Sequence, residues 1–217
     1  MTDNTQRNGN MIMLASIGLM LAIGLILYPS LPDELPRQWG IDGTINSTWS
    51  KFYAVLFAPA ISIVLWILTY IIPKVDPKRD SYDKFGGFYM RFRIALVVFF
   101  LGMHIITLTQ YDNPNAVMRL IVIGVSALFA VMGNELGRVR PTWFFGIRTP
   151  WTISDERVWT RTHRIGGRWF VGLGIINMIL ALILPAVPLF VVFMGSLLTV
   201  TFGLTAYSYV LHRRLNG

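Results

Sequence analysis

The chain lacks cysteine entirely and carries few charges for its 217 residues. Without cysteine there are no disulfide bonds and no thiolate metal sites, so its loops must be held by packing and hydrogen bonds. Charged residues make up 14% of the chain, against roughly 25% in an average soluble domain. With 54% of residues apolar, the composition indicates an integral membrane protein.

Long apolar runs separated by short polar breaks fill most of the chain. A run of about 20 apolar residues can cross a hydrocarbon core about 30 Å thick as one helix. Proline and Asn-Pro mark the breaks between runs. We predict an all-α membrane protein forming a single domain over 1–217. Its six transmembrane helices are expected at 11–28, 52–72, 92–109, 116–132, 169–184 and 189–209.

The basic residues are concentrated in alternate loops. If the N-terminus is cytoplasmic, 16 of the 19 lysines and arginines are cytoplasmic, and only Arg37, Lys51 and Arg119 are outside. Cytoplasmic loops carry such an excess, so both ends of the chain are predicted to be cytoplasmic. The same bias explains most of the net charge of +8, and direct nucleic-acid binding is not predicted.

The first apolar run could also be a cleaved signal peptide. It is longer than the usual run of about 7–15 residues, and no Ala-x-Ala cleavage site follows it. A retained span is the favoured interpretation.

The loop 29–51 is predicted to be extracytoplasmic. Its three prolines favour extended or turn backbone, and Asp42-Gly43 is typical of a tight turn. Trp39 and Trp49 are expected at the level of the outer headgroups. The loop is long for a simple connection, so a recognition surface and a structured connector both remain open.

Segment 133–168 is the most distinctive part of the chain, because it has seven arginines and no lysine. A guanidinium group binds phosphate or carboxylate through two parallel hydrogen bonds, which an ammonium group cannot do. Arg148 lies between Gly146 and Pro150, and we predict that it closes this turn onto carbonyl groups or onto Glu135. The segment is expected to be cytoplasmic.

Its second part, 152–168, predicts a helix that lies in the membrane interface before the fifth span. Thr152 and Asp155 have the spacing of a capping box. A basic face and an apolar face then run side by side, as in helices that lie at membrane surfaces. The basic face is formed by Arg157, Arg161, Arg164 and Arg168.

Three partners are open for these arginines: anionic lipid headgroups, an acidic protein surface, or acidic residues of the chain itself. A helix held by headgroups alone, without further function, is as well supported as a binding site.

Polar side chains inside the predicted spans are few, and His104 and Asn177 stand out among them. An ionisable or polar residue at membrane depth is costly and marks a candidate functional site. For His104 we favour a neutral imidazole hydrogen-bonded to another helix, and Asn177 is a similar case.

No catalytic, metal or cofactor site is predicted. The chain has no GxSxG, HExxH or phosphate-binding glycine loop. His163 is too far along the chain from the other two histidines to indicate metal ligation.

Several short sequence motifs in 133–168 resemble those of the SdpI family of bacterial membrane proteins. They are GN at 133–134, R-P at 140–141, GIRTPWT at 146–152, Trp159, and TH-R-x-GG at 162–167. The loop 29–51, with LP-x-x-LP and G-x-x-G motifs, is similar to the companion domain found at the N-terminus of many members of this family. Gln38 replaces a common histidine of that domain. Thr142 replaces the usual asparagine but can still form hydrogen bonds.

The resemblance implies a membrane protein that protects against, or senses, a secreted toxic peptide. By analogy with the family's best-known member, it also implies that a cytoplasmic repressor protein is held at the membrane. The motif residues carried over as candidate binding residues are Asn134, Gly146, Arg148, Thr149, Pro150, Trp151, Trp159, His163 and Gly166.

An alternative from a different class is a small transporter or lipid-binding protein. In that case His104 and the arginines would line a path through the membrane.

Overall fold

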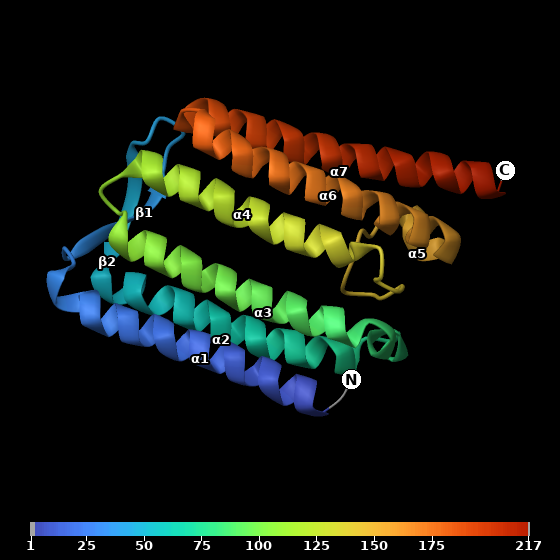
Figure 1. The fold of residues 1–217 in the computed structure, drawn as a ribbon, viewed down its shortest axis with the longest axis horizontal. Helices are drawn as coiled ribbons and strands as arrows, with labels where there is room; N and C mark the ends of the chain where they lie inside the picture. The colour runs from blue at the N-terminus through green and yellow to red at the C-terminus, as the bar shows by residue number, and fades with distance from the viewer. Residues whose placement is uncertain (1–2, 217) are drawn as a thin grey trace.

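Six long helices form the body of the protein in a computed structural model, which describes residues 3–216 (Figure 1). They are α1 (Asp3–Leu27), α2 (Lys51–Val75), α3 (Asp80–Thr109), α4 (Pro114–Leu136), α6 (Glu156–Ile183) and α7 (Ala186–Asn216). Each is long and apolar enough to cross a membrane, which confirms the six predicted spans. The shorter elements are η1 (Tyr28–Ser30), β1 (Glu34–Trp39), β2 (Ile45–Ser50) and α5 (Pro150–Ser154).

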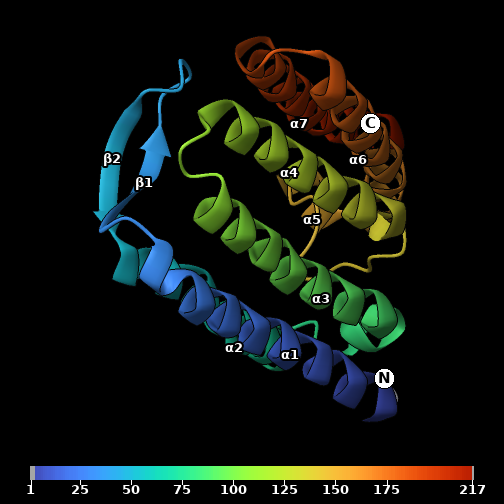
Figure 2. The same cartoon turned by 60° about the vertical axis from the view of Figure 1, so that its left-hand side comes forward.

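The helices form two groups of three. Helices α1, α2 and α3 pack together on one side, and α4, α6 and α7 on the other, with the α3–α4 turn joining the groups (Figures 1 and 2). Each group has its own apolar core. Met13, Met20 and Val97 lie in the first, and Val122 and Leu189 lie in the second.

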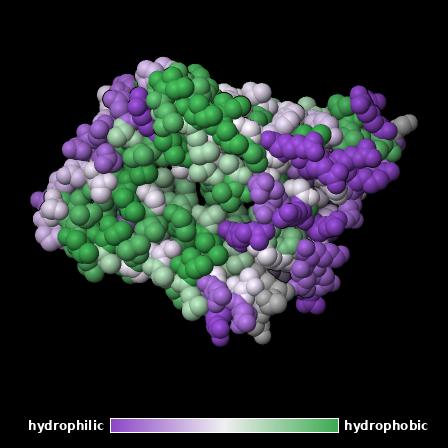
Figure 3. All heavy atoms as spheres, in the orientation of Figure 1, coloured by the Kyte–Doolittle hydropathy of each residue, from purple (hydrophilic) through white to green (hydrophobic). Residues whose placement is uncertain are grey.

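The two ends of the bundle differ in chemistry. The hairpin end carries β1 and β2. At the opposite end, the arginine end, α1, α3 and α6 begin and α2, α4 and α7 end (Figure 1). Apolar residues cover the middle of the molecule, and hydrophilic residues gather at the arginine end (Figure 3). The 16 basic residues that the charge pattern grouped together all belong to segments at this end.

The all-α prediction is wrong for the loop 29–51, which forms an antiparallel β-hairpin. Strand β1 pairs with β2 from Glu34 opposite Ser50 to Trp39 opposite Ile45, with register shifts between Pro36 and Gln38 and between Gln38 and Trp39. Pro36 lacks an amide hydrogen and cannot donate to the ladder, as is typical of an edge strand. The predicted tight turn is present, because Gly43 has a positive φ of 84°.

The predicted separate helix over 152–168 is also wrong. The helix α6 begins at Glu156, with Asp155 as its N-cap, and continues without interruption through the fifth span. The first turns of its apolar side are buried within the protein, where Val158 and Thr162 are 0% exposed, whereas Trp169 further along is 41% exposed. The basic and apolar faces are present as predicted, but the first turns of the apolar face pack on protein.

A pair of glycines lets α4 and α6 approach closely. A Cβ atom added at Gly133 would lie 2.7 Å from the carbonyl oxygen of Gly167, and one at Gly167 would lie 2.5 Å from that of Gly133. These distances are shorter than van der Waals contact, so larger residues would separate the helices. The close contact fixes the start of α6 beside the end of α4.

Candidate functional site at the arginine end

The loop between α4 and α5 folds back onto the first turns of α6. The indole Nε1 of Trp159 donates to the carbonyl of Val139 at 2.9 Å, and the amide of Ile147 donates to Nε2 of His163 at 2.8 Å. The rings of Trp159 and His163 stack with centroids 4.1 Å apart. Two side chains of α6 therefore hold both arms of the loop.

His163 is neutral in this arrangement. Its Nε2 accepts the hydrogen bond from Ile147, and its Nδ1 lies 2.8 Å from the carbonyl oxygen of Trp159. A carbonyl oxygen can only accept, so the proton is on Nδ1 and none is on Nε2. The side chain is 0% exposed and reaches no surface. His163 therefore has a structural role.

Gly146 lies against this pair of rings. It has a positive φ of 115°, and a Cβ atom at this position would lie 2.5 Å from His163 Nε2 and 2.9 Å from the Trp159 ring. Both the backbone angle and the space require glycine. This is the physical reason for the glycine in the motif GIRTPWT.

The later residues of the GIRTPWT motif cap α5 and attach it to α7. Thr149 and Thr152 form a capping box, in which each hydroxyl accepts from the other's backbone amide, and Pro150 occupies the first turn. The Thr149 hydroxyl also lies 3.0 Å from the Ser208 hydroxyl of α7. Trp151 packs on Tyr209 of α7, with ring centroids 5.0 Å apart. The box begins three residues earlier than the predicted Thr152–Asp155 pair.

Asp76, in the α2–α3 connection, holds the loop from the other side. Its carboxylate accepts from the Tyr82 hydroxyl at 2.9 Å, the Trp143 amide at 3.0 Å and the Lys78 amide at 2.8 Å. The residue is 2% exposed. The sequence predicts no role for this connection, because its charges alternate in sign as in many solvated loops.

Thr142 performs the role expected from its asparagine-like position. Its hydroxyl donates to the carbonyl of Phe145 at 2.7 Å and accepts from the Phe145 amide at 3.2 Å. This turn directs Phe145 into the aromatic cluster of α3, where its ring centroid lies 4.8 Å from that of Phe92. The predicted hydrogen bonding of threonine at this position is confirmed.

The arginines of α6 lie on the opposite side of that helix from His163. All four are exposed: Arg157, Arg161, Arg164 and Arg168. Arg157 pairs with Asp155 at 2.8 Å. This contact holds the pKa of the Asp155 carboxyl well below its usual range. Within the described residues the other three form no ion pair, so the chain's own acids account only for Arg157.

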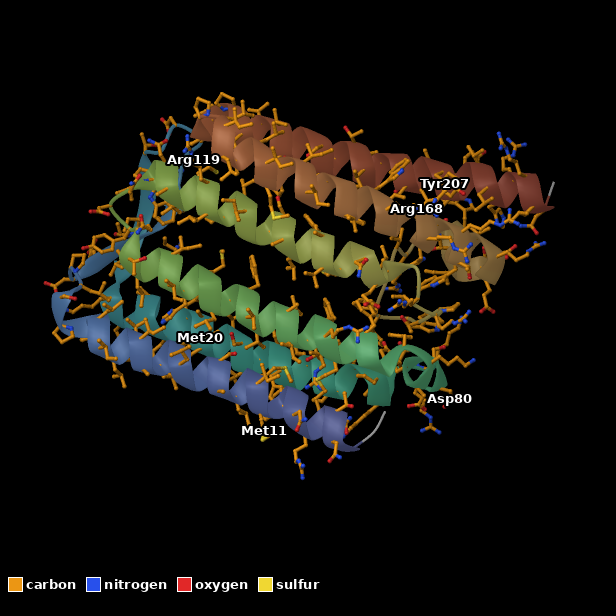
Figure 4. All side chains as sticks on the ribbon, viewed as in Figure 1. Met11, Met20, Asp80, Arg119, Arg168 and Tyr207 are labelled. Atoms are coloured by element: carbon orange, nitrogen blue, oxygen red, sulfur yellow. The ribbon has the colours of Figure 1, made fainter. Side chains whose placement is uncertain are left out.

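We call these four side chains the arginine face. Arg168 lies nearest the middle of the bundle, while the rest of the face leads to the exposed start of α6 (Figure 4). A hollow of about 420 Å³ lies along it, lined by Glu156, Arg157, Thr160, Arg161 and Arg164. A second hollow of about 540 Å³ lies next to Glu156 and is lined by Lys78, Lys84 and Arg140.

The expected contact between Arg148 and Glu135 is absent. Glu135 pairs instead with Arg91 at 3.0 Å and with Arg138 at 2.6 Å. Arg148 is exposed and forms no ion pair with any side chain that the structure describes. The turn is closed by Gly146, Thr142 and His163, so Arg148 points outward, and Asn134 is also exposed.

The two polar residues predicted within the spans bond to neighbouring helices. His104 Nε2 lies 3.0 Å from the Met20 carbonyl of α1, as the favoured interpretation expected. Asn177 donates to the Ser196 hydroxyl of α7 at 3.0 Å. His104 lies near the hairpin end of α3, away from the arginine face on α6. Residues 3–216 contain no group of three His, Asp or Glu side chains able to hold a metal.

A second buried charge was missed besides Asp76. Arg93 was counted with the cytoplasmic loops, but it lies within α3 and is only 3% exposed. The signal in the sequence was its position one residue inside the predicted third span.

Comparisons with known proteins agree with this anatomy. Residues 138–208 match the SdpI/YfhL protein family, and residues 15–63 match a domain of unknown function, DUF1648. The chain is 24% identical over 208 residues to "Immunity protein SdpI" of Bacillus subtilis (strain 168), covering 96% of this chain and 98% of that protein. No solved structure is significantly similar to the chain. The predicted resemblance is confirmed, and with its six spans the chain is a multi-pass protein of the cell membrane.

Proposed function

We propose that this SdpI-type membrane protein is a non-enzymatic immunity protein, which protects its cell against a secreted toxic peptide. The full-length similarity to an immunity protein supports the role. We further propose that it senses the peptide and holds a cytoplasmic regulator at the membrane. The hairpin end would meet the peptide, and the arginine end would meet the regulator.

One observation carries the second part of the proposal. The buried members of the motif hold the loop and the start of α6 in place, whereas the arginine face has little to do with folding. Three of its four guanidinium groups have no acidic partner in the described chain. A fixed row of arginines suits an acidic protein surface, because each guanidinium can bind a carboxylate through two hydrogen bonds.

The hairpin offers the surface for the peptide. Its tip has two exposed isoleucines, Ile41 at 48% and Ile45 at 55%. Its base is anchored by Leu35, which is buried against the starts and ends of the spans. Two exposed isoleucines beside a polar turn, on a fixed base, are suited to contact an amphipathic peptide as it reaches the membrane.

The orientation is part of the proposal, with both ends of the chain and the arginine end in the cytoplasm. The cysteine-free chain allows a direct test by single cysteine substitution. In intact cells, Asn46→Cys at the hairpin should react with an impermeant thiol reagent, and Thr160→Cys should react only after lysis. Reaction of both variants in intact cells would contradict this orientation.

Peptide challenge tests the proposed function. Cells with and without the gene are exposed to the peptide fraction secreted by the producing strain, and membrane depolarisation is followed. Cells that express the protein should keep their potential, while cells without it should depolarise. Equal depolarisation in both, with normal protein levels in the membrane, would exclude an immunity role.

The alternative function, a small transporter, gains no support from the described residues. His104 is buried and hydrogen-bonded to Met20, and it lies on a different helix from the arginine face. A lipid-binding role rests on a different residue, the buried Arg93 of α3.

A further inference from the structure

Arg93 is a buried cation without a buried anion. Its Nε donates to the Thr69 hydroxyl at 3.0 Å, and its Nη2 lies 3.4 Å from the carbonyl oxygen of Trp66. It forms no ion pair with any side chain in the described part of the chain. The side chain is nevertheless 97% buried, since only 3% of it is exposed.

Such an arrangement is energetically unfavourable on its own. A guanidinium group stays protonated and has five N–H donors, whereas its two partners here are neutral oxygens. Burying a charge is costly unless an opposite charge compensates it. An anion beside the guanidinium would offset this cost.

A cavity beside Arg93 has room for this anion. It has a volume of about 530 Å³ and lies between α1, α2 and α3 at the arginine end. Lys74 and Arg79 line it together with Arg93. The Lys74 ammonium lies 3.7 Å from the centre of the Tyr70 ring, which orients it at the cavity wall.

The acidic residues of the cavity do not neutralise Arg93. Asp80 and Asp83 also line it, but Asp80 lies 3.8 Å from Arg79, and neither forms an ion pair with Arg93. Asp80 is the first residue of α3 and lies at the arginine end of that helix (Figure 4). The cavity thus has three basic and two acidic side chains, with the unpaired positive charge at its buried wall.

We infer that this cavity binds a phosphate group, with Arg93 as its central ligand. The planar guanidinium matches a phosphate through two hydrogen bonds, and Lys74 adds a second positive charge. The cavity lies at the end of the apolar band, where basic pockets between spans bind phospholipid headgroups. Tyr70, Tyr89 and Met90 also line it and give apolar contact beside the charges. The phosphate can come from an anionic lipid or from a soluble ion.

The experiment measures the unfolding temperature of the purified full-length protein in neutral detergent. Phosphatidylglycerol, phosphatidylcholine and inorganic phosphate are added separately. A ligand at about 100 times its Kd should raise the unfolding temperature by about 5 °C or more, because it binds only the folded state. A response to phosphatidylglycerol alone assigns the site to a lipid, and a response to inorganic phosphate assigns it to a soluble ion.

Matched variants connect the response to Arg93. Arg93→Gln should abolish the shift, whereas Arg91→Gln should keep it, because Arg91 is exposed on the same helix and pairs with Glu135. Lys74→Gln should weaken binding, and Asp83→Asn should strengthen it by removing a like charge. These two rim variants keep the test valid if Arg93→Gln does not fold.

Two results would overturn the inference. One is an equal response of the wild type and Arg93→Gln to every addition, including no response in either. The other is a ligand affinity of Lys74→Gln that equals or exceeds that of Asp83→Asn, which is contrary to the expected order. This test does not involve the toxic peptide, so its outcome is independent of the proposed immunity function.

Discussion

The two connections outside the bundle, the hairpin at 31–50 and the loop at 137–155, are held by different means. Both lack disulfides, and each contains a glycine with positive φ. The hairpin is held largely by its own bonds: its strand ladder, the Thr48–Glu34 contact at 2.7 Å, and the turn in which Asp42 accepts from Thr44. The arginine-end loop bonds to the α2–α3 connection, to α6 and to α7.

This difference predicts how far the structural effect of a single substitution should extend. The hairpin side-chain bonds are exposed and close in the chain, so their loss affects mainly the hairpin. The loop bonds are buried and join residues far apart in the chain, such as Asp76 and Trp143. Damage there should loosen both groups of helices at once.

The largest effect is expected from Gly146→Ala, and Gly43→Ala is its counterpart in the hairpin. Gly146→Ala combines a left-handed backbone strain of about 1–2 kcal/mol with overlap against His163 and Trp159, which adds about 1–3 kcal/mol. We expect the free energy of unfolding to fall by about 3 kcal/mol. Gly43→Ala, whose Cβ would lie 3.3 Å from Pro114, should lose only about 1 kcal/mol. Denaturant unfolding of both variants measures this, and equal losses would remove the distinction between the regions.

A somewhat smaller loss is expected for Asp76→Ala. The change leaves the Tyr82 hydroxyl and the Trp143 amide without their shared acceptor, and hydrogen bonds to a charged group contribute roughly 1.5–3 kcal/mol. Asp83→Ala is the control, because Asp83 is an exposed acid of the next helix. Protease cleavage within 137–149 should increase for Asp76→Ala only. Unchanged cleavage would mean that Asp76 does not hold the loop.

His163→Leu should act more locally. The Ile147 amide would lose its acceptor while buried, at a cost of about 1–3 kcal/mol, and the stacking on Trp159 would be partly kept. Hydrogen exchange at the Ile147 amide should become much faster. Thr48→Ala, which removes an exposed bond of the hairpin, should change stability by less than about 0.5 kcal/mol. Protection of the Ile147 amide in the leucine variant would contradict the assigned role.

The sequence predicted the spans, the alternating direction of successive spans and the exposed arginine side of α6. These features follow from the length of the apolar runs, the charge bias of the loops and the helical period. Hairpin pairing was missed, since three prolines and a tight turn favour extended backbone without specifying a partner strand. The roles of Asp76 and Arg93 were missed for a different reason. Each depends on residues far away in the chain, Trp143 for Asp76 and Thr69 for Arg93, and no local pattern reports such contacts.

The same limit explains the error over 152–168. An apolar stripe beside a basic stripe has the same period whether the apolar side meets lipid or protein. The glycines at 133 and 167, which bring α4 against α6, decide between them. Their significance depends on two helices facing each other, which the sequence of either helix does not contain.

The arginine face should have the smallest effect on stability. Its side chains are exposed, and only Arg157 is paired, so the quadruple alanine variant of Arg157, Arg161, Arg164 and Arg168 should unfold within about 1 kcal/mol of the wild type. Binding of the cytoplasmic regulator should nevertheless be lost, because the arginine face is its proposed binding surface. Single alanine changes should be mild, since each arginine contributes on the order of 1 kcal/mol to binding.

The central claim concerns segment 133–168. Its buried residues form a structural scaffold, and its arginine face forms an exposed binding surface that requires arginine. The most direct test replaces all four arginines of the face by lysine and measures both unfolding and the retention of the cytoplasmic regulator at the membrane of cells exposed to the secreted peptide fraction. We predict wild-type stability and membrane levels with regulator retention lost, because lysine keeps the charge but not the two-hydrogen-bond contact. Full regulator retention by the quadruple lysine variant would contradict the claim and reduce the face to a simple electrostatic anchor.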